Sequence, residues 1–124
     1  MIDYSPRIVE HFANPRNVGE MDDADLKAVV ANPVCGDQIH LFARVRDDRL
    51  TECSFLAYGC AASIATASIL SDEITGRAID EIEAIDEDAV VEMVGGFAPN
   101  HRHCATLAQD VVSALVQDYR EGLG

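Results

Sequence analysis

Three of the four cysteines are candidate metal ligands, and two of these stand beside a further possible ligand. Asp37 follows Cys35 by two positions, His103 directly precedes Cys104, and Cys60 follows a glycine. Thiolate, imidazole and carboxylate groups are the side-chain ligands that zinc and iron take in proteins. These residue types therefore indicate a metal site with three sulfur ligands and with either Asp37 or His103 as the fourth ligand.

The local sequence favours ionised sulfur at these three positions. Cys35 lies in a loop with Gly36, whereas Cys60 and Cys104 fall at the starts of two predicted helices. A thiolate is the form that binds metal, and the unpaired N–H groups and positive dipole end of a helix start favour an anion. A site of three sulfurs and one oxygen or nitrogen would also exchange its metal readily, since carboxylate matches a soft metal poorly.

The spacing of the cysteines argues against several other kinds of site. No two of them form a Cys-x-x-Cys pair, as thioredoxin-type motifs and ordinary zinc ribbons require. A disulfide framework belongs to secreted chains, and residues 1–6 lack the features of a secretory signal. An electron-carrying ferredoxin would have four closely spaced cysteines, which this chain lacks. The sequence also shows no pairing of a nucleophile with a base of the kind that a hydrolase needs.

Hydrophobic periodicity predicts the elements that carry the first two cysteines. Residues 5–13 read as a short helix with Ser5 as its N-cap, and residues 26–31 as a short strand. Apolar and polar residues alternate over 38–46 and 50–58, which predicts an antiparallel hairpin with a turn at Asp47 and Asp48. Cys35 therefore precedes one strand of the hairpin, and Cys60 follows the other.

The second half of the chain reads as helical. An alanine-rich, apolar stretch over 61–75 predicts a buried helix that closes at Gly76, and two short acidic helices follow within 79–94. From Leu107 to Tyr119, apolar residues recur at the spacing of one helix face, which predicts an amphipathic C-terminal helix. Cys104 belongs to the first turn of that helix.

The remaining cysteine and two histidines have structural explanations. Cys53 shares the apolar face of its predicted strand with Phe55, so packing accounts for it. His11 lies on the first helix, where a local hydrogen bond is expected, and His40 points outward from its strand. We expect none of these three to bind metal.

Composition and charge narrow the class of protein. With 124 residues and 48% hydrophobic content, we expect a single domain over residues 1–124. No apolar stretch reaches the roughly 20 residues that a membrane span needs, so we expect no membrane association and a cytoplasmic location. The formal net charge of −13 argues against nucleic acid as a partner, because a polyanion would be repelled.

Five short motifs follow one another along almost the whole chain. They are Tyr4-Ser5, His11-Phe12-x-Asn14-Pro15-Arg16-Asn17-x-Gly19, Cys35-Gly36-Asp37, Tyr58-Gly59-Cys60-Ala61-Ala62-Ser63-Ile64-Ala65-x-Ala67-Ser68, and His103-Cys104-Ala105-x-Leu107-Ala108. In this order they resemble the iron-sulfur scaffold family that comprises IscU, SufU and the N-terminal domain of NifU. The resemblance implies an α+β fold of the SufE/NifU type, with a three-stranded antiparallel sheet packed against about five helices.

The same resemblance implies a function and a set of partners. A cysteine desulfurase delivers persulfide sulfur, which combines with iron and electrons from an iron donor and an electron donor into a transient 2Fe-2S cluster. The cluster then passes to apo iron-sulfur proteins, so the chain is a scaffold and not an enzyme. By the resemblance, Cys35, Cys60, Cys104, Asp37 and His103 form the cluster and metal site. Cys104 corresponds to the persulfide acceptor, and Asp37 to the residue that keeps the site labile.

A zinc-dependent persulfide acceptor of the SufU type is the alternative function. Three thiolates and Asp37 would suit tetrahedral Zn²⁺ at metal–sulfur distances of about 2.3 Å. In addition, the sequence around Cys35 and after Cys104 is closer to that of SufU. However, His103 is present, and the SufU insertion between the second and third cysteines is absent. These two features favour the scaffold.

One segment argues against a particular partner. Residues 97–101 read Phe-Ala-Pro-Asn-His, where typical IscU proteins have Leu-Pro-Pro-Val-Lys for a dedicated Hsp70-type chaperone. We therefore do not expect delivery through such a chaperone. His101 replaces the lysine, and its position is that of an ordinary surface residue.

Overall fold

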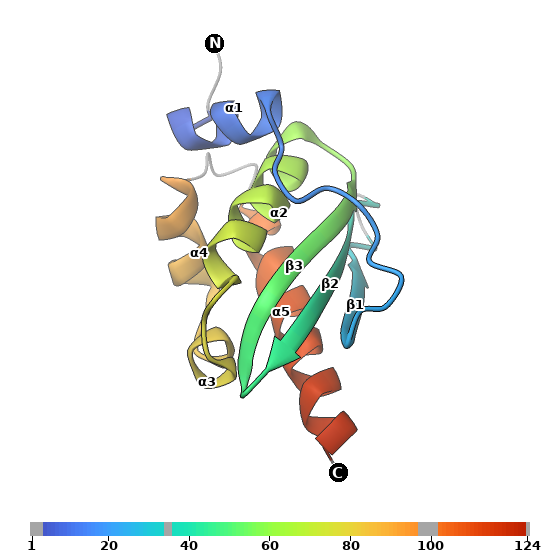
Figure 1. Cartoon of the computed structure of the whole chain (residues 1–124). Coiled ribbons are helices and arrows are strands. Elements are labelled where there is room, and N and C mark those ends of the chain that lie inside the picture. Colours follow the sequence, from blue (N-terminus) through green and yellow to red (C-terminus); the bar gives the residue numbers. More distant parts are fainter. Residues whose placement is uncertain (1–3, 34–35, 97–101, 124) are drawn as a thin grey trace.

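A three-stranded sheet with helices packed on it organises the chain (Figure 1). The computed structural model describes residues 4–33, 36–96 and 102–123. The elements follow one another as α1 (Pro6–Ala13), β1 (Leu26–Ala31), β2 (Gln38–Arg46), β3 (Arg49–Tyr58), α2 (Ala61–Ile74), α3 (Ile79–Glu83), α4 (Glu87–Val94) and α5 (His103–Leu123). The predicted α+β architecture is confirmed. Cys35 and residues 97–101, including His101, lie outside the described residues.

The sheet is antiparallel throughout, in the order β1-β2-β3. Asp47 and Asp48 join β2 to β3 with φ values of 54° and 62°. Positive φ at both central residues is the signature of a two-residue hairpin turn, and aspartate tolerates it better than most residues. The predicted hairpin is therefore confirmed, with β3 starting one residue earlier than expected.

The two longest helices pack against the sheet. Helix α2 contacts β3, and α5 contacts β1 and β2 (Figure 1). Ten of the fourteen residues of α2 are buried, which explains why its sequence is rich in alanine and has no charged face. No helix within the described ranges has the length and apolar character that crossing a membrane requires.

Local sequence signals account for the helix ends. Ser5 caps α1, with its Oγ accepting a hydrogen bond from the backbone N–H of Ile8 at 3.1 Å. Asp86 caps α4 in the same way, and Gly95 closes that helix with φ of 83°. These ends agree with the predicted boundaries.

Cys53 and His11, two of the three residues expected to have structural roles, are buried. Cys53 belongs to the hydrophobic core, and burial raises its pKa to about 12. His11 is also buried, but its partners are less local than expected, because Nδ1 lies 2.8 Å from the Oγ of Ser68 and Nε2 lies 2.6 Å from Arg16. His11 therefore joins α1 to α2.

Candidate metal centre

The register of the hairpin brings the first part of the site together. Gln38 at the start of β2 pairs with Tyr58 at the end of β3, so the residues just outside this pair are neighbours. Asp37 precedes β2, and Cys60 follows β3 as the N-cap of α2. The Sγ of Cys60 lies 3.5 Å from the Oδ2 of Asp37.

The start of α5 supplies the other two side chains. The Nε2 of His103 lies 3.5 Å from the Oδ2 of Asp37 and 3.7 Å from the Sγ of Cys104. One ligand atom from each of Asp37, Cys60, His103 and Cys104 can be chosen so that all four lie within 4.8 Å of one another. The structure thus brings together four of the five predicted site residues, and the fifth, Cys35, is outside the described part of the chain.

These separations are close to those around a tetrahedral metal ion. Bond lengths of about 2.3 Å to sulfur and 2.0–2.2 Å to nitrogen or oxygen give ligand-to-ligand distances of about 3.4–3.6 Å in a tetrahedron. The three distances quoted above are 3.5, 3.5 and 3.7 Å. These three pairs are therefore spaced as around one ion, whereas the group as a whole spans up to 4.8 Å and would have to close further. Both Asp37 and His103 belong to the closely spaced pairs.

Gly59 makes room for the Asp37 side chain. A Cβ atom at position 59 would lie 2.3 Å from the Oδ1 of Asp37 and 2.5 Å from its Cγ, and the φ of Gly59 is 143°. Any other residue would meet both a steric clash and an unfavourable backbone conformation. The glycine before Cys60 is therefore required by the site itself.

Ser63 is the site residue that sequence reasoning missed. Its buried Oγ donates a hydrogen bond to the Oδ2 of Asp37 at 2.6 Å and lies 3.3 Å from the Sγ of Cys104 and 3.5 Å from that of Cys60. In sequence it is one of several small polar residues in an apolar helix. Its spacing of three residues after Cys60, which places both on one helix face, was the available signal.

The Asp37 carboxylate is ionised in spite of its burial. Burial raises the pKa of this carboxyl, but hydrogen bonds from Ser63, Cys60 and His103, together with the charge of His103, lower it by more. The net result is a pKa below the usual range for aspartate. Asp37 thus offers a negatively charged oxygen to a cation.

The expectation of an ionised sulfur is wrong for Cys104 in this structure. Cys104 lies in the first turn of α5 as predicted, but only 1% of it is exposed, and burial raises the pKa of its thiol to about 12. The nearby Cys60 and Asp37 also disfavour a further negative charge. Desolvation outweighs the helix start, so Cys104 is a neutral thiol until a cation or a movement changes its surroundings.

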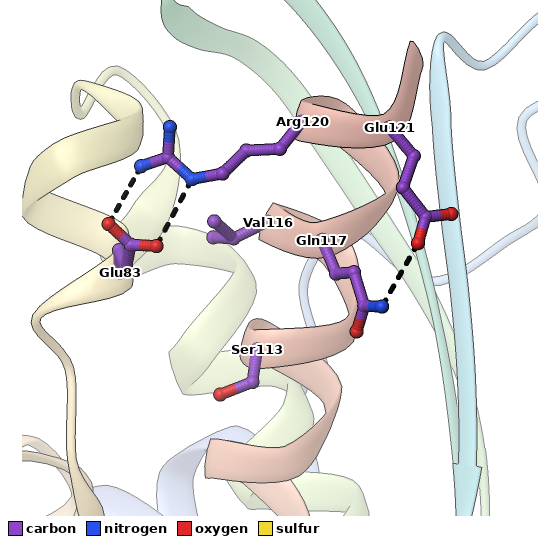
Figure 2. Close-up of a pocket in the computed structure, with 6 residues that line it drawn as sticks. All are labelled: Glu83, Ser113, Val116, Gln117, Arg120 and Glu121. Atoms are coloured by element: carbon purple, nitrogen blue, oxygen red, sulfur yellow. Dashed lines mark hydrogen bonds and ion pairs between the residues drawn. The ribbon is translucent and has the colours of Figure 1, made fainter. Parts of the chain in front are cut away.

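A groove between α3 and α5 has a different character. Figure 2 shows the side chain of Arg120 directed at Glu83, which it binds through two hydrogen bonds. Among the α5 residues of this groove, Ser113 is the nearest in sequence to Cys104. It lies nine residues beyond Cys104, or about 13 Å along the helix. The groove residues include neither a thiol nor an imidazole, so we assign no metal chemistry to it.

Comparison with known proteins identifies the family. Residues 3–123 match the model of the family described as NifU-like N terminal domain. The chain belongs to this family. The resemblance seen in the sequence motifs is thereby confirmed for nearly the full length of this NifU-like chain.

Relatives and solved structures agree with this membership. The chain is 42% identical over 116 residues to iron-sulfur cluster assembly scaffold protein IscU 1 of Archaeoglobus fulgidus, covering 94% of this chain and 76% of the relative. It is 35% identical over 121 residues to IscU of Escherichia coli K12, covering 94% of both. The N-terminal NifU-like protein of Brucella abortus has the same fold, with a TM-score of 0.78 at 23% identity over 96% of this chain and 95% of that one. The scaffold protein for the SUF system of Fervidobacterium islandicum also has this fold, with a TM-score of 0.73 at 20% identity over 91% of this chain and 96% of that one.

Proposed function

We propose that this NifU-like chain is a scaffold on which a 2Fe-2S cluster is assembled and from which it passes to apo-proteins. The grouping of Asp37, Cys60, His103 and Cys104 within 4.8 Å carries the proposal. Thiolates suit iron-sulfur clusters, whereas a carboxylate matches them poorly, so such a set can both hold a cluster and release it. The relatives named as IscU scaffold proteins support the same function.

The five predicted residues take unequal parts in this proposal. Cys35, Cys60 and Cys104 supply the sulfur ligands, and either Asp37 or His103 completes the set. With Asp37 as the fourth ligand, an incoming acceptor displaces it more easily than a cysteine, because its oxygen is the least suited to the cluster. This role for Asp37 is supported by its contacts, because Cys60, Ser63 and His103 all approach its Oδ2.

Sulfur arrives as a persulfide on a cysteine desulfurase, and we assign its receipt to Cys104. Once uncovered, the Cys104 thiol loses its proton to solvent, and the thiolate attacks the outer sulfur. The donor S–S bond breaks, and the desulfurase cysteine leaves as a thiolate. Two such sulfurs need four electrons to become the two sulfides of the cluster. Oxidation of two ferrous ions to ferric ions supplies two electrons, and a separate electron donor supplies the other two.

The burial of Cys104 sets a condition on this step. With 1% of the residue exposed, its sulfur must be uncovered before a desulfurase can reach it. Incubation with desulfurase and cysteine, followed by mass spectrometry, should find one added sulfur on Cys104 and none on the Cys104→Ser variant. A persulfide that stays on Cys60 in that variant would assign the acceptor role to Cys60 instead.

Anaerobic reconstitution tests the scaffold function directly. The protein is incubated with ferrous iron, cysteine, the desulfurase and a reductant, and visible absorption is recorded together with iron, sulfide and zinc content. We expect a cluster chromophore with matching iron and sulfide, and loss of this chromophore when an apo-ferredoxin is added. A protein that instead keeps stoichiometric zinc and forms no chromophore would be the zinc-dependent persulfide acceptor.

A further inference from the structure

Ser63 lies at the centre of the ligand group, yet no step of the assembly described above uses it. The residue is fully buried, and its Oγ contacts Asp37, Cys60 and Cys104. We propose that Ser63 is a positioning residue that holds the Asp37 carboxylate in the orientation in which it binds metal. This inference rests on the proposed function, because it takes the ligand group to be a metal site.

The direction of the hydrogen bond follows from the chemistry of its partners. A hydroxyl has one proton and two lone pairs, and an ionised carboxylate can only accept. The Oγ to Oδ2 distance between Ser63 and Asp37 is 2.6 Å, within the range of charge-assisted O–H···O⁻ bonds. Ser63 therefore gives its proton to Asp37, so it can only accept at its contact with the Cys104 thiol.

The oxygen that Ser63 holds is the one that faces the other ligands. The same Oδ2 of Asp37 lies 3.5 Å from the Sγ of Cys60 and 3.5 Å from the Nε2 of His103. A hydrogen bond to a ligating carboxylate fixes its orientation and so contributes to metal affinity. Because Ser63 is the third residue of α2, the buried helix holds the donor in place.

Of the other three buried hydroxyls of α2, Ser68 contacts His11, and the remaining two donate within the helix. Thr66 donates to the carbonyl of Ala62 at 2.6 Å, and Ser71 donates to that of Ser68 at 2.7 Å. Such bonds to a preceding carbonyl are the usual local choice for serine and threonine in helices. Ser63 instead donates to Asp37, which is 26 positions away in the sequence.

A pair of matched variants tests the role of Ser63. Co²⁺ is titrated into chelator-treated parent, Ser63→Ala and Ser71→Ala proteins, and binding is followed by thiolate-to-cobalt and ligand-field absorption. Ser63→Ala should bind Co²⁺ about ten- to a hundred-fold more weakly, with altered ligand-field bands. Ser71→Ala removes the same atoms from the same buried helix but touches no ligand, so its affinity and spectrum should match the parent.

A double-mutant cycle shows whether Ser63 acts through Asp37. In an Asp37→Ala background the further change Ser63→Ala should have almost no effect on Co²⁺ affinity, because the carboxylate that it orients is gone. An undiminished effect in that background, or a Ser63→Ala protein that binds Co²⁺ like the parent, would overturn the inference. So would a Ser63→Ala chain that does not fold without metal, because this would show a purely structural role.

Failure of this inference differs from failure of the proposed function. If the parent forms its cluster and binds Co²⁺ but Ser63→Ala behaves identically, only the role of Ser63 is wrong. If the parent binds Co²⁺ in a Ser63-dependent way but forms no cluster, the scaffold function is wrong and the positioning role stands. A parent that binds no Co²⁺ would remove the basis of the inference.

Discussion

Asp37 combines two properties that seldom occur in one residue, namely burial and a negative charge held by three donors. Its oxygen is a poor match for iron in a cluster, so an incoming thiolate displaces it more easily than a cysteine. Asp37→Ala should therefore transfer its cluster to an apo-ferredoxin about tenfold more slowly than the parent. The transfer rate is measured by circular dichroism of the recipient's cluster.

A parallel measurement keeps this prediction separate from affinity. Asp37→Ala is expected to bind a single Co²⁺ ion more weakly, since it has lost a ligand, while releasing an assembled cluster more slowly. The first quantity is an equilibrium constant, and the second is a rate of ligand displacement. Unchanged transfer rates would remove Asp37 from the release step.

His11 should make the stability of the fold depend on pH. Burial and the positive charges of Arg16 and Arg7 lower its pKa below the usual 6.5. The Arg16 guanidinium can only donate, so it needs an unprotonated Nε2, 2.6 Å away. The unfolded chain then takes up a proton at higher pH than the folded chain. This contribution to stability is therefore present above pH 6.5 and lost as the pH falls below that value.

The check on His11 is a comparison of two denaturation series. Urea unfolding of the parent and of His11→Gln is measured at about pH 7.5 and 5.5, a range in which an ordinary histidine titrates. The parent should lose more free energy of unfolding between the two values than the variant, which has no group to protonate at this position. Equal losses in both proteins would show that His11 is not the source.

At the scale of elements, the junction between β3 and α2 is where a small change should have a large effect. Gly59→Ala would force a Cβ atom against Asp37 and impose φ of 143° on an alanine. We expect a loss of about 1–3 kcal/mol in the free energy of unfolding, together with weaker Co²⁺ binding as Asp37 is displaced. After treatment with a chelator, the free energy of unfolding is measured with urea, and Co²⁺ affinity is measured by titration of the same preparation.

Gly76, after the other end of α2, provides the matched control. Its φ is 89°, but a Cβ atom at this position would meet nothing within 4 Å. Gly76→Ala should therefore lose stability through backbone strain alone and keep the Co²⁺ affinity of the parent. Equal losses of metal affinity in both variants would mean that strain, and not the contact with Asp37, disturbs the site.

At the scale of the whole molecule, the excess of negative charge should make the fold respond to salt. The chain carries 22 acidic and 9 basic residues, and its ion pairs, such as that of Arg120 with Glu83, are largely exposed. Salt screens repulsion and attraction alike, and with this imbalance repulsion is the larger sum. The free energy of unfolding in urea should rise between about 0.05 and 0.5 M NaCl. A fall would show that the exposed ion pairs dominate.

Local sequence patterns were sufficient to predict the elements and to indicate most of the candidate site. The alternation of apolar and polar residues predicted the strands of the hairpin. Ser5 predicted the start of a helix, and the paired aspartates predicted a turn. The family motifs indicated the site residues, which are Asp37, Cys60, His103 and Cys104. These features could be predicted because each depends on residues close together in the chain, or on sequence motifs that relatives share. Boundaries missed by one residue, as at Arg49, depend on pairing across the sheet.

How these residues act on one another became visible only in the folded chain. Helix starts favour thiolates in isolation, but the packing of Cys104 inside the molecule raises the pKa of its thiol. Ser63 looked like a small residue in an apolar helix until the fold placed its hydroxyl against Asp37. Burial and contacts between distant residues set the ionisation and hydrogen bonding of a side chain. Neither can be computed from neighbours in the sequence, because both arise only when strand register and helix packing bring the groups together.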